Sequence, residues 1–287
     1  MSMSRELLKF DDLAPYLLLK NGNFLYRIPF RGGWAVLKVY FGSRGTLGRI
    51  HKSLNNVLFY GQTSYMPRTR CRVERECIHL WRSHGFRVFD LYEDVEVEAP
   101  SCVSGGYMLF EYVKAPRLVD HIQNEDIPLE TRFEKYRQFL GDWGRRHALA
   151  IEHREPRLVH ENGDGKHVLI LPDGDLLWFD FEMTFRHPHR VEEHVSHEIV
   201  QFLWFLLKVL PPALAERVLQ ETITHYPSRE RLAVAHDYFF HHPRPLLRLG
   251  RALDRKFRAR AQKKTSKYNV AAKLKAALDA KKAFQPG

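Results

Sequence analysis

Four short segments constrain the fold of this chain more than any other feature of its sequence. The first is an apolar run that ends at Lys38, and the second is an apolar run that contains Glu111. The third is a polar loop, and the fourth is an apolar run that leads into Asp180. Their ranges are 34–38, 107–112, 160–167 and 177–182. Each is too short to be specific alone, so the information lies in their order and spacing.

The first part of the chain has the pattern of a small β-sheet. Apolar residues predict three strands within 17–40, joined by turns at Asn21-Gly22 and Arg31-Gly32-Gly33. A helix is predicted next, and it ends at Gly85 because glycine commonly follows a last helical turn. Two further strands follow. The predicted ranges are 67–84 for the helix and 88–97 and 107–113 for the two strands.

From about residue 117 the pattern becomes that of helices. The spacing of apolar residues predicts long helices over 129–153 and 199–210, with a short strand pair at 168–171 and 176–180. A β-rich part followed by a helical part indicates the α+β class, with a small N-terminal lobe and a larger C-terminal lobe. We expect these lobes at 1–113 and 114–250, followed by a basic tail at 251–287.

The positive charge of the chain is concentrated at its end. Of a formal net charge of +11, residues 251–287 carry +10, because they hold twelve Lys/Arg and two Asp/Glu. One helical face of this tail carries Leu253 and Phe257, and later Val270, Leu274 and Leu278. A basic amphipathic segment is typical of binding to an anionic membrane surface. A terminal helix packed on the C-terminal lobe is the alternative, and nucleic acid is the least favoured partner because few aromatic residues interleave the charges.

The remaining composition is that of an ordinary globular protein. The chain has 287 residues, 44% of them hydrophobic, and its three cysteines form no CxxC pair. We expect reduced, packed cysteines and a cytoplasmic location, since no export signal is recognised at the N-terminus. The most apolar stretch, 199–210, is too short to cross a bilayer.

Lys38 is the first candidate for a functional residue. It stands among Val36, Leu37 and Val39 in a strand that should be largely buried, where an ammonium group needs an anionic partner. We expect that partner to be Glu76 or Glu74 from the following helix, with Glu76 preferred. An edge-strand lysine that reaches solvent is the plainer alternative.

Asp180 is the second candidate, because it ends an apolar strand and precedes Phe181-Glu182. A carboxylate held at such a position suits Mg²⁺, which prefers oxygen ligands. A simple turn aspartate is the alternative.

The loop at 160–167 carries the closest likeness to a known family. His160-Glu161-Asn162, then Lys166-His167 and an apolar strand, resembles the catalytic loop of the lipopolysaccharide core sugar kinases, the Kdo and heptose kinases of the protein-kinase-like superfamily. The connector at 45–54 is also similar to that of the heptose kinases. The likeness covers roughly residues 15 to 210.

The resemblance implies ATP- and Mg²⁺-dependent phosphorylation of a sugar hydroxyl, on lipopolysaccharide core or a related glycolipid, at the inner face of a bacterial membrane. It implies that Lys38 grips phosphates, that Glu76 orients Lys38, and that Asp180 holds Mg²⁺ with help from His167. It also implies an adenine-binding hinge formed by Glu111, Tyr112 and Val113.

Two departures from the family pattern favour a different reading. Asn162 stands where the family has its catalytic aspartate, and an amide does not accept the proton of an acceptor hydroxyl. Asp164, two residues later, is the candidate that could replace it. The hairpin at 21–23 also lacks a glycine-rich phosphate cover. The alternative is therefore a pseudokinase, a binding or scaffolding module with little turnover. A protein kinase is less favoured, because Glu161 replaces the arginine that many protein kinases carry in this loop.

Overall fold

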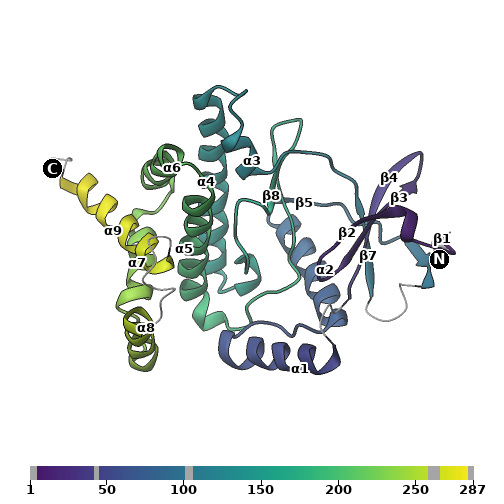
Figure 1. The fold of residues 1–287 in the computed structure, drawn as a ribbon, viewed down its shortest axis with the longest axis horizontal. Helices are drawn as coiled ribbons and strands as arrows, with labels where there is room; N and C mark the ends of the chain where they lie inside the picture. The colour runs from purple at the N-terminus through teal and green to yellow at the C-terminus, as the bar shows by residue number, and fades with distance from the viewer. Residues whose placement is uncertain (1–4, 42–44, 101–105, 258–265, 284–287) are drawn as a thin grey trace. The chain divides into compact units, whose positions relative to one another are not determined.

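The protein has an α+β fold, with most of its strands in one unit and most of its helices in a second, as the sequence predicts. The computed structural model describes residues 5–41, 45–100, 106–257 and 266–283. The first unit comprises Met1–Ala115 and Leu177–Arg186, and the second comprises Pro116–Leu176 and His187–Gly287. The basic tail falls in the second unit, and the end of the chain is coloured yellow in Figure 1.

A four-stranded antiparallel sheet forms the centre of the first unit. Its order is β2-β3-β4-β7, with bounds Leu17–Lys20, Phe24–Phe30, Gly33–Val39 and Tyr107–Glu111. The three strands predicted between residues 17 and 40 are therefore confirmed. Gly22 makes the turn between β2 and β3 with φ of 76°, a conformation that costs glycine little. Lys38 lies on β4, opposite Leu25 on β3 and Met108 on β7.

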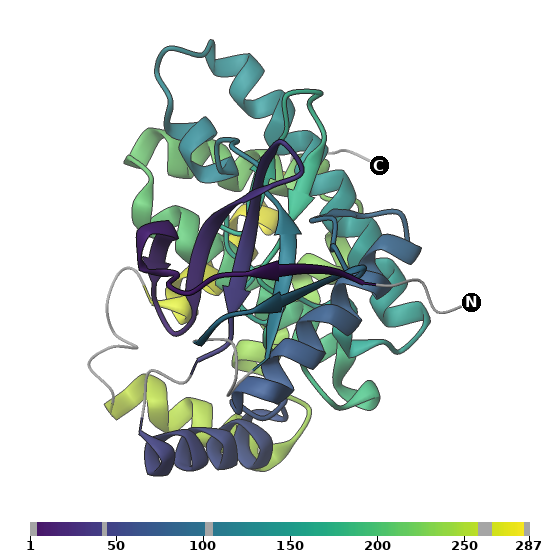
Figure 2. The ribbon, with the colours of Figure 1, turned by 90° about the vertical axis from the view of Figure 1, so that its right-hand side faces the viewer.

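A parallel pair of strands covers one face of this sheet. β1 (Glu6–Lys9) pairs with β6 (Val95–Glu98), and Figure 2 shows the pair crossing the strands of the larger sheet. Val95 and Val97 share one apolar core with Ile28 and Leu37. A short 3₁₀ turn, Ala14–Tyr16, leads into β2.

The single strand predicted at 88–97 is wrong. The chain forms β5 (Arg87–Val88), makes an isolated antiparallel bridge from Leu91 to Phe110 of β7, and forms its next strand only at β6. Asp90, between β5 and this bridge, makes local side-chain contacts: its carboxylate accepts from Arg82 at 2.8 Å, and its backbone N–H donates to the Glu111 carboxylate at 2.9 Å. Such side-chain bonds compete with strand pairing.

Helix α2 (Pro67–Ser83) packs its apolar face inside the first unit and ends before Gly85, whose φ is 75°. The predicted helix is confirmed. The connector before it, for which we predicted no secondary structure, forms α1 (Thr46–Asn55) and the π-helical turn Asn56–Tyr60. Cys71 and Cys77 are buried free thiols on α2, whereas Cys102 lies outside the described residues.

The segment 177–186 returns to the first unit by pairing with β5. Strand β9 (Leu176–Trp178) runs parallel to β5, with Arg87 opposite Leu177 and Val88 opposite Trp178. Ring contacts then fix the chain beyond β9, because Trp81 of α2 lies 5.6 Å from Trp178 and 4.5 Å from Phe181 between ring centroids. Asp180 is therefore held between two anchored aromatic residues.

The second unit is helical around an aromatic core. In α4, Tyr136, Phe139 and Trp143 are fully buried, and Phe139 stacks on Phe202 of α5 with ring centroids 4.6 Å apart. The helices and strand of this unit are α3 (Leu118–Gln123), α4 (Leu129–Glu152), β8 (Val168–Ile170), α5 (Val191–Val209), α6 (Pro212–His225), α7 (Arg229–Phe240), α8 (Pro245–Phe257) and α9 (Lys267–Ala283), with 3₁₀ turns at Pro156–Leu158 and Pro188–Arg190. Within the described residues, none of the helices has the length and apolarity needed to span a membrane.

Helix α9 settles one of the alternatives for the basic tail. Val270, Leu274 and Leu278 are buried, and α9 packs against α5, α6 and α7. The packed helix is therefore correct for this part of the tail, and these three residues do not form a membrane-facing surface.

Candidate active site

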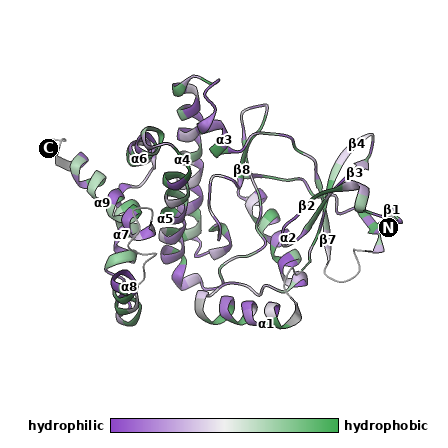
Figure 3. Cartoon of the chain, viewed as in Figure 1, coloured by the Kyte–Doolittle hydropathy of each residue, from purple (hydrophilic) through white to green (hydrophobic). Residues whose placement is uncertain are grey.

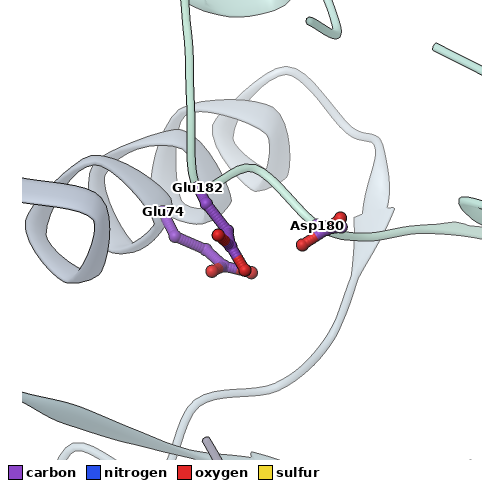
Figure 4. Close-up of side chains that lie close together, drawn as sticks. All are labelled: Glu74, Asp180 and Glu182. Carbon is purple, nitrogen blue, oxygen red and sulfur yellow. The ribbon is translucent and has the colours of Figure 1, made fainter. Parts of the chain in front are cut away.

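The ammonium group of Lys38 lies among three carboxylates of the first unit. Its Nζ is 2.7 Å from Glu74 Oε2, 2.9 Å from Glu182 Oε1 and 3.3 Å from Asp180 Oδ1. Glu74 comes from α2, whereas Asp180 and Glu182 come from the chain beyond β9 (Figure 4). The predicted convergence of Lys38 and Asp180, which are far apart in the sequence, is thus present in the structure.

The preference for Glu76 as the partner of Lys38 is wrong. Glu76 lies on the exposed side of α2, where its carboxylate pairs with Arg72 at 3.0 Å. Glu74 is buried and also accepts a 2.5 Å hydrogen bond from the hydroxyl of Tyr40. Two residues along a helix correspond to a rotation of about 200°, so only one of the two glutamates faces the sheet.

Glu182 connects three parts of the first unit. Its carboxylate accepts from Nε of Arg70 at 2.8 Å and from the side-chain amide of Asn23 at the β2–β3 turn. Arg70 in turn donates to Asn23 Oδ1 at 2.9 Å and to the carbonyl of Phe41 at 3.2 Å. Arg70 is almost completely buried, at 2% exposure. The hairpin turn that lacks a glycine-rich cover is therefore fixed by a buried polar network.

Burial and charge act in opposite directions on Lys38. Burial lowers the pKa of its ammonium group, but the carboxylates of Glu182, Glu74 and Asp180 outweigh burial and hold that pKa above its ordinary value. The pKa of Glu74 is raised, because burial and the neighbouring carboxylates outweigh the attraction of Lys38. Lys38 is therefore a permanent positive charge in this cluster.

Asp180 has an uncommon backbone conformation and a partly exposed carboxylate. Its φ of 72° lies in the left-handed region, which aspartate tolerates better than most residues but still adopts uncommonly. Its side chain is 32% exposed, compared with 4% for Glu74 and 16% for Glu182. Oxygens of the three carboxylates lie within 4.8 Å of one another. This donor set fits a hard cation such as Mg²⁺, with Asp180 as the accessible ligand.

A strand lysine paired with a helix glutamate, together with an aspartate held after a later strand, is the arrangement that protein kinases use to position nucleotide phosphates. Within the first unit, the structure brings Lys38, a glutamate of the following helix and Asp180 together, as the sequence implied, although that glutamate is Glu74 and not Glu76.

A buried carboxylate, that of Glu198, holds the backbone of the polar loop at 160–167 in the second unit. Glu198 of α5 accepts from the backbone N–H of His160 at 2.9 Å and from Trp143 Nε1 at 2.9 Å, and it pairs with Arg146. These cationic and polar partners hold the pKa of Glu198 well below its usual value against the effect of burial. The backbone of the loop packs closely against Glu198 at Gly163, since a Cβ at this position would lie only 2.5 Å from Glu198 Cγ.

Within this loop, the side chains contact one another. His167 Nδ1 lies 2.9 Å from the backbone oxygen of Asn162, to which it donates, and its ring stacks on that of His160. Asp164 is buried, and its Oδ1 accepts from the backbone N–H of Lys166 at 2.9 Å and lies 3.3 Å from His167 Nδ1. The side chain of Asn162 is exposed. In this conformation the Asp164 carboxylate therefore stabilises the loop through its contacts with Lys166 and His167.

The predicted adenine hinge follows β7. The Glu111 carboxylate pairs with Arg87 at 2.9 Å and accepts from the backbone N–H of Asp90, so its side chain is engaged within the first unit. Tyr112 and Val113 are half-buried, and the guanidinium of Arg27 lies 5.6 Å from the Tyr112 ring centroid.

Sequence reasoning missed three residues of the cluster: Arg70, Tyr40 and Glu182. For Arg70 and Tyr40 the sequence offers no signal that separates them from ordinary surface residues. Glu182 was visible as the residue after Asp180-Phe181, a position that many kinases fill with glycine. A carboxylate two residues after Asp180 was therefore the sequence feature that could have indicated Glu182 as a member of the cluster.

Comparisons with known proteins find distant similarity to solved structures and no matching family. No protein-family model and no curated protein matches this chain. A solved structure of WaaP in complex with acyl carrier protein is 13% identical and has a TM-score of 0.41, covering 94% of this chain and 88% of that one. Rio2 kinase from Chaetomium thermophilum is similar at 13% identity: its ADP/Mg²⁺-phosphoaspartate complex gives a TM-score of 0.40 over 94% of this chain and 70% of that one. A second Rio2 structure gives 0.41, over 93% and 72%. At this identity and these scores, neither neighbour's activity carries over to this chain.

Proposed function

We propose that this protein is an ATP-dependent phosphotransferase that phosphorylates a sugar hydroxyl of lipopolysaccharide core or a related glycolipid. The observation that carries the proposal is the cluster in which Lys38 lies 2.7 Å from Glu74 and 3.3 Å from Asp180. Phosphoryl transfer needs little covalent chemistry from the protein, and it depends on such positioned charges and on a metal ion.

In this proposal Lys38 binds nucleotide phosphates while Glu74 fixes its position, the role that we first expected of Glu76. Asp180 would hold Mg²⁺, with His167 as a second ligand, and the ion would supply positive charge to neutralise the phosphates. Nδ1 of His167 donates to the carbonyl of Asn162, so Nε2 of a neutral ring would carry the lone pair. The backbone at Glu111, Tyr112 and Val113 binds adenine.

The acceptor hydroxyl is positioned by the loop of the second unit. Asp164 takes its proton if the side chain leaves its contacts with Lys166 and His167, while Asn162 orients the sugar. The acceptor class is taken from the sequence resemblance, because a kinase-like fold alone does not specify an acceptor. A glycolipid acceptor and the basic segment 251–287 together favour a peripheral location at the inner face of the membrane.

The test is transfer of labelled phosphate from ATP to glycolipid extracts, with Mg²⁺ present or removed. We expect Lys38→Met and Asp180→Asn to lower transfer by at least about 10²-fold, since each removes a charge that acts on the phosphates. Asp164→Asn should lower it by about 10²–10⁴-fold, the usual cost of losing a general base. Full transfer by Asp164→Asn would exclude that role.

The alternative is a pseudokinase, favoured by the exposed asparagine Asn162 at the catalytic position. It predicts that ATP and Mg²⁺ raise the melting temperature while no acceptor is phosphorylated. Asn162→Asp separates the two functions: an enzyme that works slowly with Asn162 should gain rate, whereas a binding module that lacks an acceptor site should gain none.

A further inference from the structure

Helix α8 carries an apolar face that is turned outward. Leu246, Leu249, Leu253 and Phe257 follow one another at spacings of three or four residues, so they lie on one side of the helix. Their exposed fractions are 84%, 58%, 47% and 71%. A surface helix of a globular protein normally buries such a stripe against its core. Figure 3 shows the hydrophobic and hydrophilic residues that alternate along α8.

The opposite, basic face of α8 is the one that packs on the second unit. The guanidinium of Arg251 lies 5.1 Å from the ring centroid of Phe239, and its Nη2 is 3.9 Å from the Glu193 carboxylate. Arg255 donates to the backbone oxygen of Phe239 at 3.3 Å and lies over the ring of Phe240 at 4.6 Å. The helix is thus held by its arginines, and this fixes the outward direction of its leucines.

The exposed charged residues of α8 are basic. Lys256 is exposed and borders the apolar stripe, whereas Arg248 is exposed on the side of Arg251 and Arg255, and Arg244 is exposed just before the helix. The acid of α8, Asp254, accepts a 3.0 Å hydrogen bond from the hydroxyl of Tyr268. From residue 251 onward, twelve Lys/Arg stand against two Asp/Glu. The occupant of this face therefore has to be apolar and anionic at the same time.

We propose that α8 binds the surface of an anionic lipid bilayer, with Leu246, Leu249, Leu253 and Phe257 inserted at the boundary between headgroups and acyl chains. The four residues span about 16 Å along the helix, at 1.5 Å per residue. Such a narrow strip suits the plane of a membrane, which needs no matching shape, and exposed cations beside it attract anionic headgroups. This inference assigns the membrane contact to 245–257, not to α9, whose apolar residues are buried. It does not depend on phosphotransfer.

The test is sedimentation of the full chain with vesicles of phosphatidylcholine alone or with phosphatidylglycerol added. We expect binding to the anionic vesicles. The combined substitution Leu249→Asn, Leu253→Asn and Phe257→Asn should weaken it at least about 100-fold, since three inserted side chains are lost. Arg248→Ala with Lys256→Ala should weaken it about tenfold or more on anionic vesicles only, because each basic residue contributes about fivefold there. All these positions are exposed, so the variants should keep the melting temperature of the native chain.

Leu47→Asn is the matched control, because Leu47 is as exposed as Leu246 but lies on α1 of the first unit. It should change vesicle binding by less than twofold. The proposal is overturned if the native chain binds no vesicle, if the triple variant binds as well as the native chain, or if neutral and anionic vesicles bind equally. It is also overturned if the native chain is a dimer without lipid and the triple variant is a monomer, since a second copy then covers this face.

Discussion

Glu182 Oε1 lies 2.9 Å from Lys38 Nζ, although the two residues are far apart in the sequence. Glu182 also pairs with Arg70, so one carboxylate joins two buried cations. A glycine at this position would provide neither contact. The identity of residue 182 therefore decides whether the hairpin turn, α2 and the segment around Asp180 are tied together.

A double-mutant cycle on Arg70 and Glu182 tests this connection. Glu182→Leu should lower the free energy of unfolding by about 3 kcal/mol, because it leaves the buried guanidinium of Arg70 without a carboxylate. Arg70→Met should cost a similar amount. The double variant should be more stable than the sum of the single effects indicates, since it removes both charges together. Urea unfolding followed by tryptophan fluorescence measures all three, and strictly additive effects would refute the coupling.

The two glutamates of α2 give a second prediction, with a built-in control. Glu74→Gln should weaken the grip on Lys38 and lower the free energy of unfolding by about 1–3 kcal/mol, because Glu74 is buried and also accepts from Tyr40. Glu76→Gln makes the same chemical change on the exposed side of the same helix and should stay within about 0.5 kcal/mol. Binding of ATP with Mg²⁺, measured by thermal shift, should fall only for Glu74→Gln. Equal effects of both changes would contradict the assignment.

The sequence contained the information needed to choose Glu74. Cys77 and Trp81 are among the buried apolar residues of α2, and Glu74 precedes them by three and seven positions, which places it on their face. Glu76 shares its phase with Leu80, which is only half-buried. The preference for Glu76 rested on Leu80, which lies one turn further along α2 but is not one of its buried residues.

Other features were beyond sequence reasoning for physical reasons. The direction of Glu182 depends on the positive φ of Asp180, which no local pattern specifies. Amphipathic spacing places Leu253 and Phe257 on one side of the tail, but it leaves open whether that side faces a membrane or packs on the C-terminal lobe. Contacts of Arg251 and Arg255 with the rings of Phe239 and Phe240 decide that it faces away from the lobe. By contrast, the sheet of the first unit was predictable, because its turns and strand pattern are local.

A third prediction concerns the space behind the polar loop. A Cβ at Gly163 would lie 2.5 Å from Glu198 Cγ and 2.8 Å from its Oε1. Gly163→Ala should therefore displace Glu198 from its bonds with His160 and Trp143, at a cost of about 1–3 kcal/mol in unfolding free energy.

Gly141→Ala is the control for this change, because a Cβ there meets nothing within 4 Å and the residue lies inside α4. It should stabilise the protein by up to about 1 kcal/mol, through helix propensity. If Gly163→Ala is as stable as Gly141→Ala in urea unfolding, the loop does not rest on Glu198.

The last prediction is a loss of stability in mild acid. Burial lowers the pKa of His147 to about 4, and of His194 and His197 to about 3. Unfolded, these histidines bind protons near pH 6.5, so stability is complete above that pH and falls as the pH drops toward the folded values. Each histidine should remove about 1.4 kcal/mol per pH unit across that window. The pKa of Glu198 is also lowered, but its ion pairs lose their contribution to stability only below the unfolded pKa of about 4.5. Glu198 therefore does not account for a loss of stability between pH 6.5 and 5.

His197→Phe isolates one of these protons. The phenyl ring keeps the stacking that His197 makes with Phe239, at 6.4 Å between centroids, but it binds no proton. Unfolding free energies from urea titrations at pH 7, 6 and 5 should fall less steeply with decreasing pH in this variant. The slope should be smaller by about 1.4 kcal/mol per pH unit, the contribution of one proton. A native chain with constant stability from pH 7 to 5 would mean that these histidines are already protonated when folded. If the variant keeps the slope of the native chain, His197 is not one of the histidines that cause the loss of stability.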